Sequence, residues 1–202
     1  MRNMNHVFSS LCLLLVLLVR PVICISQTIP NGGFERGAKD QPDVWFSTYT
    51  DWLRPTVESV IFHWDKEIRH SGERSVSIRV YKTFRGPEVH YNWTAPIEGW
   101  QAGSTYEVTA WVRTQNLKRR AFLVIQVIRG GELIDLIDRA KPGVKGTQDW
   151  TQIKTRFKVP RGTAVLQLRI GATADGSNKD WKVWFDDIEI TKVEKPEKKQ
   201  AN

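Results

Sequence analysis

The sequence contains very little cysteine: two residues in 202, Cys12 and Cys24, both within the first 26 positions. Because those positions have the features of a signal peptide, we expect the mature chain to hold no thiol and no disulfide. This excludes a disulfide-stapled scaffold, a cysteine nucleophile and a CxxC zinc site. Stability must then come from core packing, with or without a bound metal.

Long apolar runs are also scarce, and the only one extends from Val7 to Val19 after Arg2. It is shorter than the ~18 to 20 residues of a membrane-spanning helix, and Arg20 ends it. We therefore predict a signal peptide over residues 1–26 and a secreted or periplasmic protein without stable membrane insertion. A retained anchor and lipidation at Cys24 are the alternatives, although Ile23 stands where lipidation sites normally place a small residue.

Catalytic motifs are missing as well. The chain has no HExxH or CxxC spacing and no nucleophile elbow. Carboxylates are plentiful, but nothing marks two of them as the pair that a glycosidase holds about 5 to 10 Å apart. Three histidines, His63, His70 and His90, are better explained as unliganded side chains than as a metal site. We predict a protein that is not an enzyme, with a glycoside hydrolase as a less favoured alternative.

Charge of one sign is not concentrated in the way that nucleic-acid binding requires. Removing Arg2 and Arg20 with the leader leaves 28 Lys and Arg against 22 Asp and Glu, a net charge of +6. Only Lys118-Arg119-Arg120 and the lysines of the last eight residues cluster, and acids intersperse the rest. We therefore expect no nucleic-acid partner, and a charge that aids solubility or attraction to acidic surfaces.

Helical periodicity is absent, and the mature chain alternates apolar and polar residues in short runs instead. This period-two pattern predicts ten strands: Val44 to Thr48, Val60 to Trp64, Ser75 to Tyr81, Glu88 to Thr94, Ser104 to Thr114, Ala121 to Ile128, Glu132 to Asp138, Trp150 to Val159, Ala164 to Ile170 and Lys182 to Ile190.

Turn residues stand where these strands must reverse, as in Gly130-Gly131 and Pro160-Arg161-Gly162. Many short strands without crossover helices predict an all-β fold, a two-sheet antiparallel β-sandwich. We expect one domain over residues 27–191 and a disordered charged tail over 192–202.

The sequence also has nine tryptophans, and one of them lies in a polar setting. In Ser104 to Thr114, alternation places Tyr106 and Val108 on a core face and Trp111 and Arg113 on the outward face. A tryptophan beside an arginine suits a sugar, because the apolar face of a pyranose stacks on a ring and its hydroxyls pair with polar groups.

Other polar side chains interrupt apolar strands. Gln126 lies within Ala121 to Ile128, and Arg169 alternates with inward-facing leucines. Such residues suit a groove that reads hydroxyl groups, although a solvated sheet face explains them equally well. In Glu88 to Thr94, His90 and Asn92 share a polar face, and Asn92-Trp93-Thr94 has the pattern of a glycosylation acceptor.

Five segments, taken in order, carry a family resemblance. They are Asn31-Gly32-Gly33-Phe34-Glu35; His70-Ser71-Gly72-Glu73-Arg74-Ser75-Val76; Tyr106 to Arg113; Trp150-Thr151-Gln152 with Phe157-Lys158-Val159-Pro160; and Phe185-Asp186-Asp187-Ile188. Together they resemble the carbohydrate-binding modules of the family 4/9 and family 22 type. The resemblance implies a galactose-binding-like jelly roll that binds glycan chains without cleaving them. Such modules are usually attached to xylanases or glucanases.

The resemblance also implies a structural calcium near the chain ends, held by Glu35 and Asp186 with backbone carbonyls around Ser71 and Gly72. A hard cation that takes several oxygen ligands fits those groups chemically. It further places Trp111, Tyr91 and Gln126 at ligand-contacting positions.

The leading hypothesis from the sequence is thus a secreted, monomeric, non-catalytic module for β-glucan- or xylan-type polysaccharide. Trp111 is expected to stack on the sugar, and Arg113, Gln126 and Arg169 to donate or accept hydrogen bonds. The alternative is an extracellular protein-interaction or cell-envelope scaffold that uses the same sandwich, since fold does not determine function.

Overall fold

The computed structural model describes residues 29–50, 59–83, 88–137, 140–174, 176–177 and 179–193. The predicted signal peptide and residues 194–202 of the predicted tail lie outside these ranges. Across the described ranges, no helix combines the length and the apolar character needed to cross a lipid bilayer.

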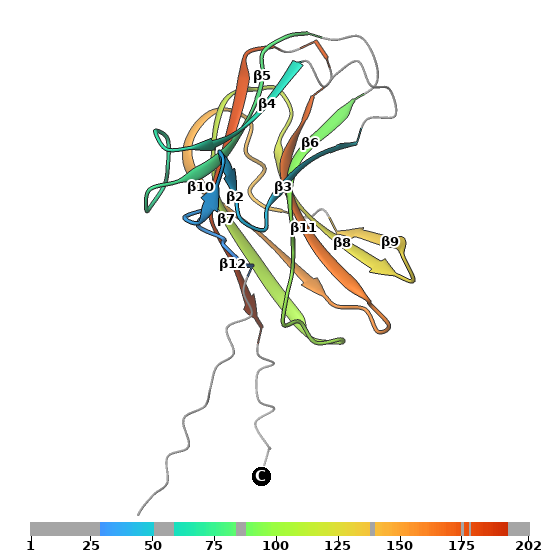
Figure 1. Ribbon diagram of the computed structural model, residues 1–202. Coiled ribbons are helices and arrows are strands. Elements are labelled where there is room, and N and C mark those ends of the chain that lie inside the picture. The colour runs from blue at the N-terminus through green and yellow to red at the C-terminus, as the bar shows by residue number, and fades with distance from the viewer. Residues whose placement is uncertain are drawn as a thin grey trace, which may run out of the picture.

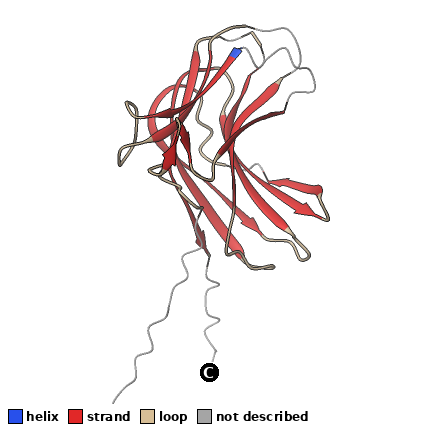
Figure 2. Ribbon diagram, viewed as in Figure 1, coloured by secondary structure: helices blue, strands red, loops and turns tan. Residues whose placement is uncertain are grey.

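Two five-stranded antiparallel sheets face each other, and a two-stranded hairpin lies beside them (Figure 1). The β12 sheet contains, in spatial order, β10 (Gly146–Lys158), β7 (Thr105–Leu117), β12 (Trp181–Lys192), β5 (Ser75–Val80) and β4 (Val60–Asp65). The β11 sheet contains β3 (Phe46–Thr50), β6 (Val89–Pro96), β11 (Val165–Ala174), β8 (Ala121–Arg129) and β9 (Glu132–Ile137). The hairpin pairs β1 (Gly37–Ala38) with β2 (Gln41–Pro42). The described chain contains no α-helix; the one short segment in the helix colour of Figure 2 is a 3₁₀ position at Ser59, just before β4.

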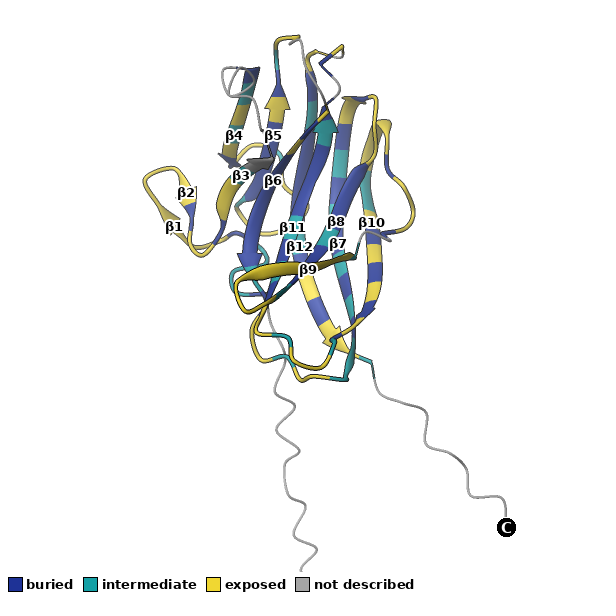
Figure 3. Ribbon diagram, turned by 90° about the vertical axis from the view of Figure 1, so that its right-hand side faces the viewer, coloured by how far each residue is buried: buried dark blue, intermediate teal, exposed yellow. Residues whose placement is uncertain are grey.

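Alternation along the strands builds the core between the sheets. In β7, Tyr106, Val108, Ala110 and Val112 are buried completely, whereas the residues between them are partly exposed. The same banding of buried and exposed positions is visible along β10 (Figure 3). Side chains from the two sheets meet in this core: Phe62 of β4 packs edge to face on Trp93 of β6, with ring centroids 5.5 Å apart. The predicted two-sheet β-sandwich is therefore confirmed.

All ten predicted strands are present, with ends that differ by a few residues. The prediction missed β1 and β2. Their two-residue loop, Lys39-Asp40, has φ of 53° and 61°, the backbone of a tight hairpin turn. Glycine and asparagine are the usual sequence signals for that turn, so the Lys-Asp pair in a short polar segment did not predict it.

The N-terminal segment closes against the last strand. The amide of Ile188 donates to the carbonyl oxygen of Gly32 at 2.9 Å. The register of β12 against β7 shifts between Asp186 and Glu189, and Asp187 has a φ of 46°. Such a bulge re-aims side chains at a strand, and here it turns two adjacent carboxylates toward residues 70–71.

Candidate functional site

The outward face of the β11 sheet presents its side chains in rows, because directly paired residues on neighbouring strands share a face. One row across β3, β6, β11 and β8 consists of Phe46, Thr94, Arg169 and Val124. The next row consists of Thr48, Asn92, Gly171 and Phe122. Beyond it lie His90 and Thr173, paired across β6 and β11, and Arg120, which immediately precedes β8.

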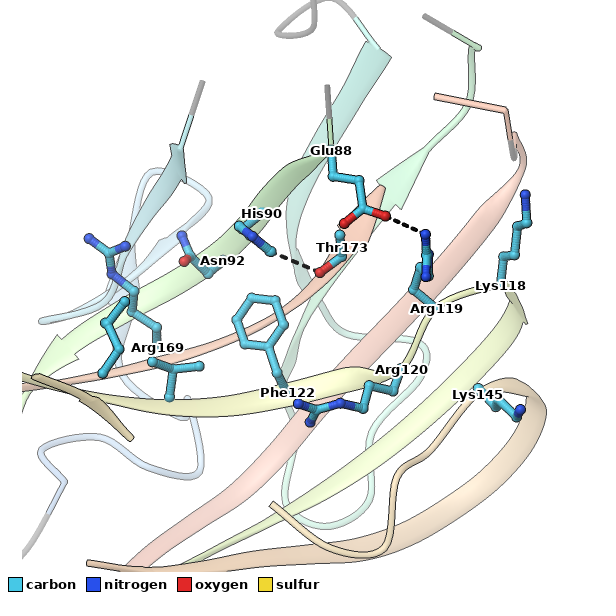
Figure 4. Close-up of a pocket in the computed structure, with 12 residues that line it drawn as sticks. Glu88, His90, Asn92, Lys118, Arg119, Arg120, Phe122, Lys145, Arg169 and Thr173 are labelled. Carbon is cyan, nitrogen blue, oxygen red and sulfur yellow. Dashed lines mark hydrogen bonds and ion pairs between the residues drawn. The ribbon is translucent and has the colours of Figure 1, made fainter. Parts of the chain in front are cut away.

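This face is hollowed into a groove of about 640 Å³. Figure 4 shows its side chains projecting from neighbouring strands and from the segment that precedes β8. The lining residues are Glu88, His90, Asn92, Lys118, Arg119, Arg120, Phe122, Val124, Leu136, Lys145, Arg169 and Thr173. Five of these described residues are Lys or Arg, and one is an acid.

A glycine in the central strand shapes the middle of the groove. A Cβ atom on Gly171 would lie 2.0 Å from the carbonyl oxygen of Tyr91 and 2.9 Å from both Cα and Cβ of Asn92. No side chain fits there, so β6 and β11 approach closely at this point. The row between Asn92 and Phe122 is therefore left without a side chain at its centre.

The polar residues around this gap are held in place by their neighbours. Asn92 is 1% exposed, and its Nδ2 donates to the carbonyl oxygen of Thr48 at 2.7 Å. Nδ1 of His90 lies 2.9 Å from Oγ1 of Thr173, and the imidazole meets the ring of Phe122 edge to face at 5.9 Å. These side chains do not need to reorganise when a ligand arrives, which lowers the entropic cost of binding.

Among the residues that the structure describes, three buried polar atoms on this face have no hydrogen-bond partner: Nε of Arg169, Oε1 of Gln126 and Oδ1 of Asn92. Within the described chain, Arg169 forms no ion pair, and burial lowers the pKa of its guanidinium. Buried polar groups without partners cost free energy, and in native proteins they often mark functional positions. Arg169 and Gln126, both predicted from the sequence, therefore lie on the groove face.

Tyr91 corrects the sequence-based expectation that it contacts a ligand. Its side chain is 0% exposed and packs 6.4 Å from the ring of Phe62 on the opposite sheet. On β6 it alternates with His90 and Asn92, which face the groove. Tyr91 is a core residue.

Trp111 and Arg113 lie on the other sheet, on the outward face of β7. One face of Trp111 stacks on the imidazole of His70, with centroids 3.9 Å apart and planes 14° apart. Trp150 meets the same imidazole edge to face at 5.6 Å. Nε of Arg113 is 3.7 Å from a carboxylate oxygen of Asp149. The five predicted carbohydrate-binding residues are thus divided between two outer faces and the core, and they form no single site.

The sequence prediction missed Phe122, Thr173 and Gly171, and it noted Arg120 only as part of the basic cluster Lys118-Arg119-Arg120. Phe122 was hidden in an apolar strand, and only the pairing of β8 with β11 shows that it shares a face with Asn92 and His90. Alternation of His90 and Asn92 with core residues was the one available signal, and it indicated the correct face of β6.

The two predicted calcium ligands lie against the same loop, residues 70–74. The carboxylate of Glu35 accepts hydrogen bonds from the amide of Glu73 at 3.0 and 3.1 Å. Oδ2 of Asp186 accepts from the amides of His70 at 2.8 Å and Ser71 at 3.2 Å, and Oδ1 accepts from the amide of Asp187 at 2.7 Å. Asp186 is completely buried, and this burial raises its pKa to about 6.

The groups around Glu35 and Asp186 suit carboxylates that accept hydrogen bonds from backbone amides better than they suit a calcium site. All four oxygens of Glu35 and Asp186 face amide groups, and the carbonyl oxygen of Gly72 accepts a bond from Arg69 at 3.0 Å. In the part of the chain that the structure describes, no group of three or more His, Cys, Asp or Glu is placed to hold a metal ion. Calcium usually takes six to eight oxygens.

A calcium ion bound by Glu35 and Asp186 stays a prediction, and thermal denaturation tests it. A calcium site predicts a melting temperature about 5 to 10 °C higher with calcium at about 100 times its dissociation constant than with excess chelator. That difference should vanish in Glu35→Gln. Equal melting temperatures with calcium and with chelator would refute the calcium site. The role of Glu35 and Asp186 would then be to accept hydrogen bonds from backbone amides.

Comparison with known proteins places the fold among carbohydrate-binding modules. No protein-family model matches the chain, and no curated protein matches it by sequence. Among solved structures, the chain is similar to the CBM22-1 and GH10 modules of Clostridium thermocellum endo-1,4-β-D-xylanase 10B in complex with xylohexaose. The TM-score is 0.58 at 15% identity, over 88% of this chain and 30% of that one.

Two further solved structures contain a region of similar fold. The CBM22-1 xylan-binding domain of Paenibacillus barcinonensis Xyn10C matches 82% of this chain and 94% of its own, with TM-score 0.53 and 13% identity. The enzymatically active domain of bacteriophage CBA120 tailspike protein 4 matches 83% of this chain and 21% of its own, with TM-score 0.57 and 13% identity. The chain thus spans less than a third of the tailspike and xylanase 10B chains. It has the jelly-roll fold of carbohydrate-binding modules.

Proposed function

We propose that this chain is a secreted, non-catalytic module that binds glycan chains in the groove of the β11 sheet. The observation that carries the proposal is the groove itself: a hollowed sheet face lined by pre-positioned polar side chains, with the partnerless Nε of Arg169 and Oε1 of Gln126 on the same face. The fold supports it, because solved structures with this architecture include xylan-binding modules. Polysaccharide is the proposed partner, and the protein acts as a monomer.

The groove and the sheet face beside it, where Phe46 and Gln126 lie, combine the two surfaces that a sugar requires. Phe46, at the β3 end of the Arg169 row, is 41% exposed and offers an open ring for the apolar face of a pyranose. The amide and guanidinium groups of Gln126 and Arg169 face the same side and can pair with hydroxyls. Leu136 of β9, which is 52% exposed, closes the opposite edge with an apolar wall.

Binding of moderate strength follows from this geometry. A ring stack contributes about 0.5 to 1.5 kcal/mol beyond area burial, and each hydrogen bond contributes roughly 1 kcal/mol. Micromolar affinity needs about 8 kcal/mol, so several sugar residues must bind at once. An open groove across four strands accommodates such a chain.

A matched pair of aromatic substitutions tests the site. We expect Phe46→Ala to weaken polysaccharide binding at least about tenfold, whereas Trp111→Ala should change affinity less than about twofold, because Trp111 lies on the other sheet. Affinity electrophoresis through gels that contain neutral and acidic polysaccharides measures both effects, and melting temperatures report folding. Loss of binding in Trp111→Ala alone would move the site to the β12 sheet. Absence of retardation by every polymer would favour a protein-interaction domain.

A further inference from the structure

Positive side chains outnumber acidic ones in the groove. Among the described residues that line it, Lys118, Arg119, Arg120, Lys145 and Arg169 face a single acid, Glu88. A second hollow, on the outer face of the β12 sheet, is lined by Arg113, Lys182, Glu67 and Asp149, two cations and two acids. The modest net charge of the chain therefore does not account for the excess of positive charge in the groove.

Glu88, the one acid among the described lining residues, does not neutralise the centre of the groove. Glu88 pairs with Arg119 at the end near β6. Arg169 lies three rows away from Glu88, half-buried, with no ion pair in the described chain and with a partnerless Nε. A partly desolvated guanidinium without a counter-charge costs free energy, and an anion bound beside it would recover that cost.

The positions of the cations suit a chain with repeated charges. Arg169 and Thr173 are four residues apart on β11, which is about 13 Å along a strand. Arg120 lies at the Thr173 end of the groove, because Ala121 pairs with Ala172. The floor between these ends includes Gly171, which has no side chain to interrupt a bound chain. Two anion contacts whose backbone positions lie about 13 Å apart along the strand call for more than one carboxylate or sulfate group.

We infer that the groove binds anionic glycans, polymers that carry carboxylate or sulfate groups on successive sugars, with Arg169 and the Arg120 end as two anion contacts. This inference rests on the proposed function and narrows its ligand. Arginine suits the role because its planar guanidinium pairs with carboxylate and sulfate oxygens in a bidentate manner. Phe46 and Leu136 would contact the apolar faces of the sugars beside those contacts.

Polymers matched in sugar and different in charge test the inference. The full mature chain is run through gels that contain polygalacturonate, its fully methyl-esterified form, carrageenan or desulfated carrageenan, with xylan and mixed-linkage β-glucan as neutral polymers. We expect retardation by one or both charged polymers and at least about tenfold weaker binding to the matched uncharged form. Binding should also weaken as salt rises from about 50 to about 500 mM. Carboxylates lose their charge near pH 3 whereas sulfates keep it, so binding at low pH distinguishes the two sources.

Three charge-matched variants locate the contacts. Arg169→Gln and Arg120→Gln should each weaken binding to the charged polymer about tenfold or more. Arg113→Gln removes the same charge from the outer face of the other sheet and should change affinity less than about twofold. The melting temperature of Arg169→Gln should not fall, because Arg169 forms no ion pair in the described chain.

Each remaining result overturns one claim. Retardation by a neutral polymer without preference for its charged counterpart would refute the anionic ligand and leave the proposed glycan-binding function standing. Retardation by none of the polymers would refute the function as well. Loss of charged-polymer binding in Arg113→Gln, with Arg169→Gln unchanged, would refute the groove as the site.

Discussion

Gly171→Ala is expected to lower the free energy of unfolding by about 3 kcal/mol or more. The new methyl group would stand 2.0 Å from the carbonyl oxygen of Tyr91 in the middle of the β11 sheet, with backbone on the far side of the contact. Overpacking in a well-packed interior costs about 1 to 3 kcal/mol and more where backbone must move. The strand pair must separate, which also weakens the ladder between β6 and β11. Thermal denaturation should show a midpoint about 6 to 12 °C lower.

Gly143→Ala is the control for this substitution. A Cβ atom on Gly143 would meet only the side chain of Arg120, at the ordinary distance of 3.7 Å. Its unfolding midpoint should stay within about 2 °C of the parent protein. If both variants melted at the same temperature, the close approach of β6 and β11 would not be what requires glycine at position 171.

Asp186→Ala is expected to destabilise the fold by about 3 kcal/mol. The substitution removes the acceptor of three amide groups, those of His70, Ser71 and Asp187, at a completely buried position. A buried donor left without a partner costs about 1 to 3 kcal/mol. The loss is partly offset because a buried carboxylate, whose pKa is raised to about 6, disappears with it. Chemical denaturation in urea measures the difference.

The neighbouring carboxylate supplies the comparison. Asp187 accepts a hydrogen bond from Oγ of Ser71 at 2.7 Å and lies 2.6 Å from Nδ1 of His70, at a partly exposed position. Asp187→Asn keeps a side chain that tolerates the φ of 46° at this position, so it should cost about 1 kcal/mol or less. If both variants lost the same free energy of unfolding, the burial of Asp186 would not be the reason that this carboxylate stabilises the fold.

Sequence periodicity was enough to predict the strands, because each strand buries one face and the pattern of that face is local. Tyr106, Val108 and Ala110 show the period directly, and all three are completely buried. Turn chemistry located the hairpin at Gly130 and Gly131, which both have positive φ. The β1–β2 hairpin, by contrast, bends at Lys39-Asp40, a pair whose residue types carry little information about the turn.

The site was harder to predict because it depends on which strands are neighbours. Alternation showed that Trp111, Arg169 and Gln126 leave the core, and all three do lie on outer faces. It could not show that β7 and β11 belong to different sheets, which separates Trp111 from Arg169. The prediction for Tyr91 was wrong for another reason. It followed from the family resemblance, whereas the alternation of Tyr91 with His90 indicates a core position.

The surroundings of the two predicted calcium ligands, Glu35 and Asp186, show the same limit at closer range. Sequence brought Glu35 and Asp186 together correctly, since both contact residues 70–74. Whether the loop offers carbonyl oxygens or amide groups to those carboxylates depends on the orientation of a few peptide planes. Residue types do not encode that orientation, and Gly72, with a φ of 56°, widens the choice.

The buried amide of Asn92 has a consequence for how the protein should be produced. Attachment of an N-linked glycan requires the Nδ2 atom to be accessible, yet this atom donates to the carbonyl oxygen of Thr48, and the residue is 1% exposed. The Asn92-Trp93-Thr94 acceptor pattern can therefore be modified only before β3 docks on β6. A glycan added at that moment would stand where Thr48 belongs and would prevent the edge strand from pairing. A host that does not glycosylate its secreted proteins is accordingly the right source of homogeneous material.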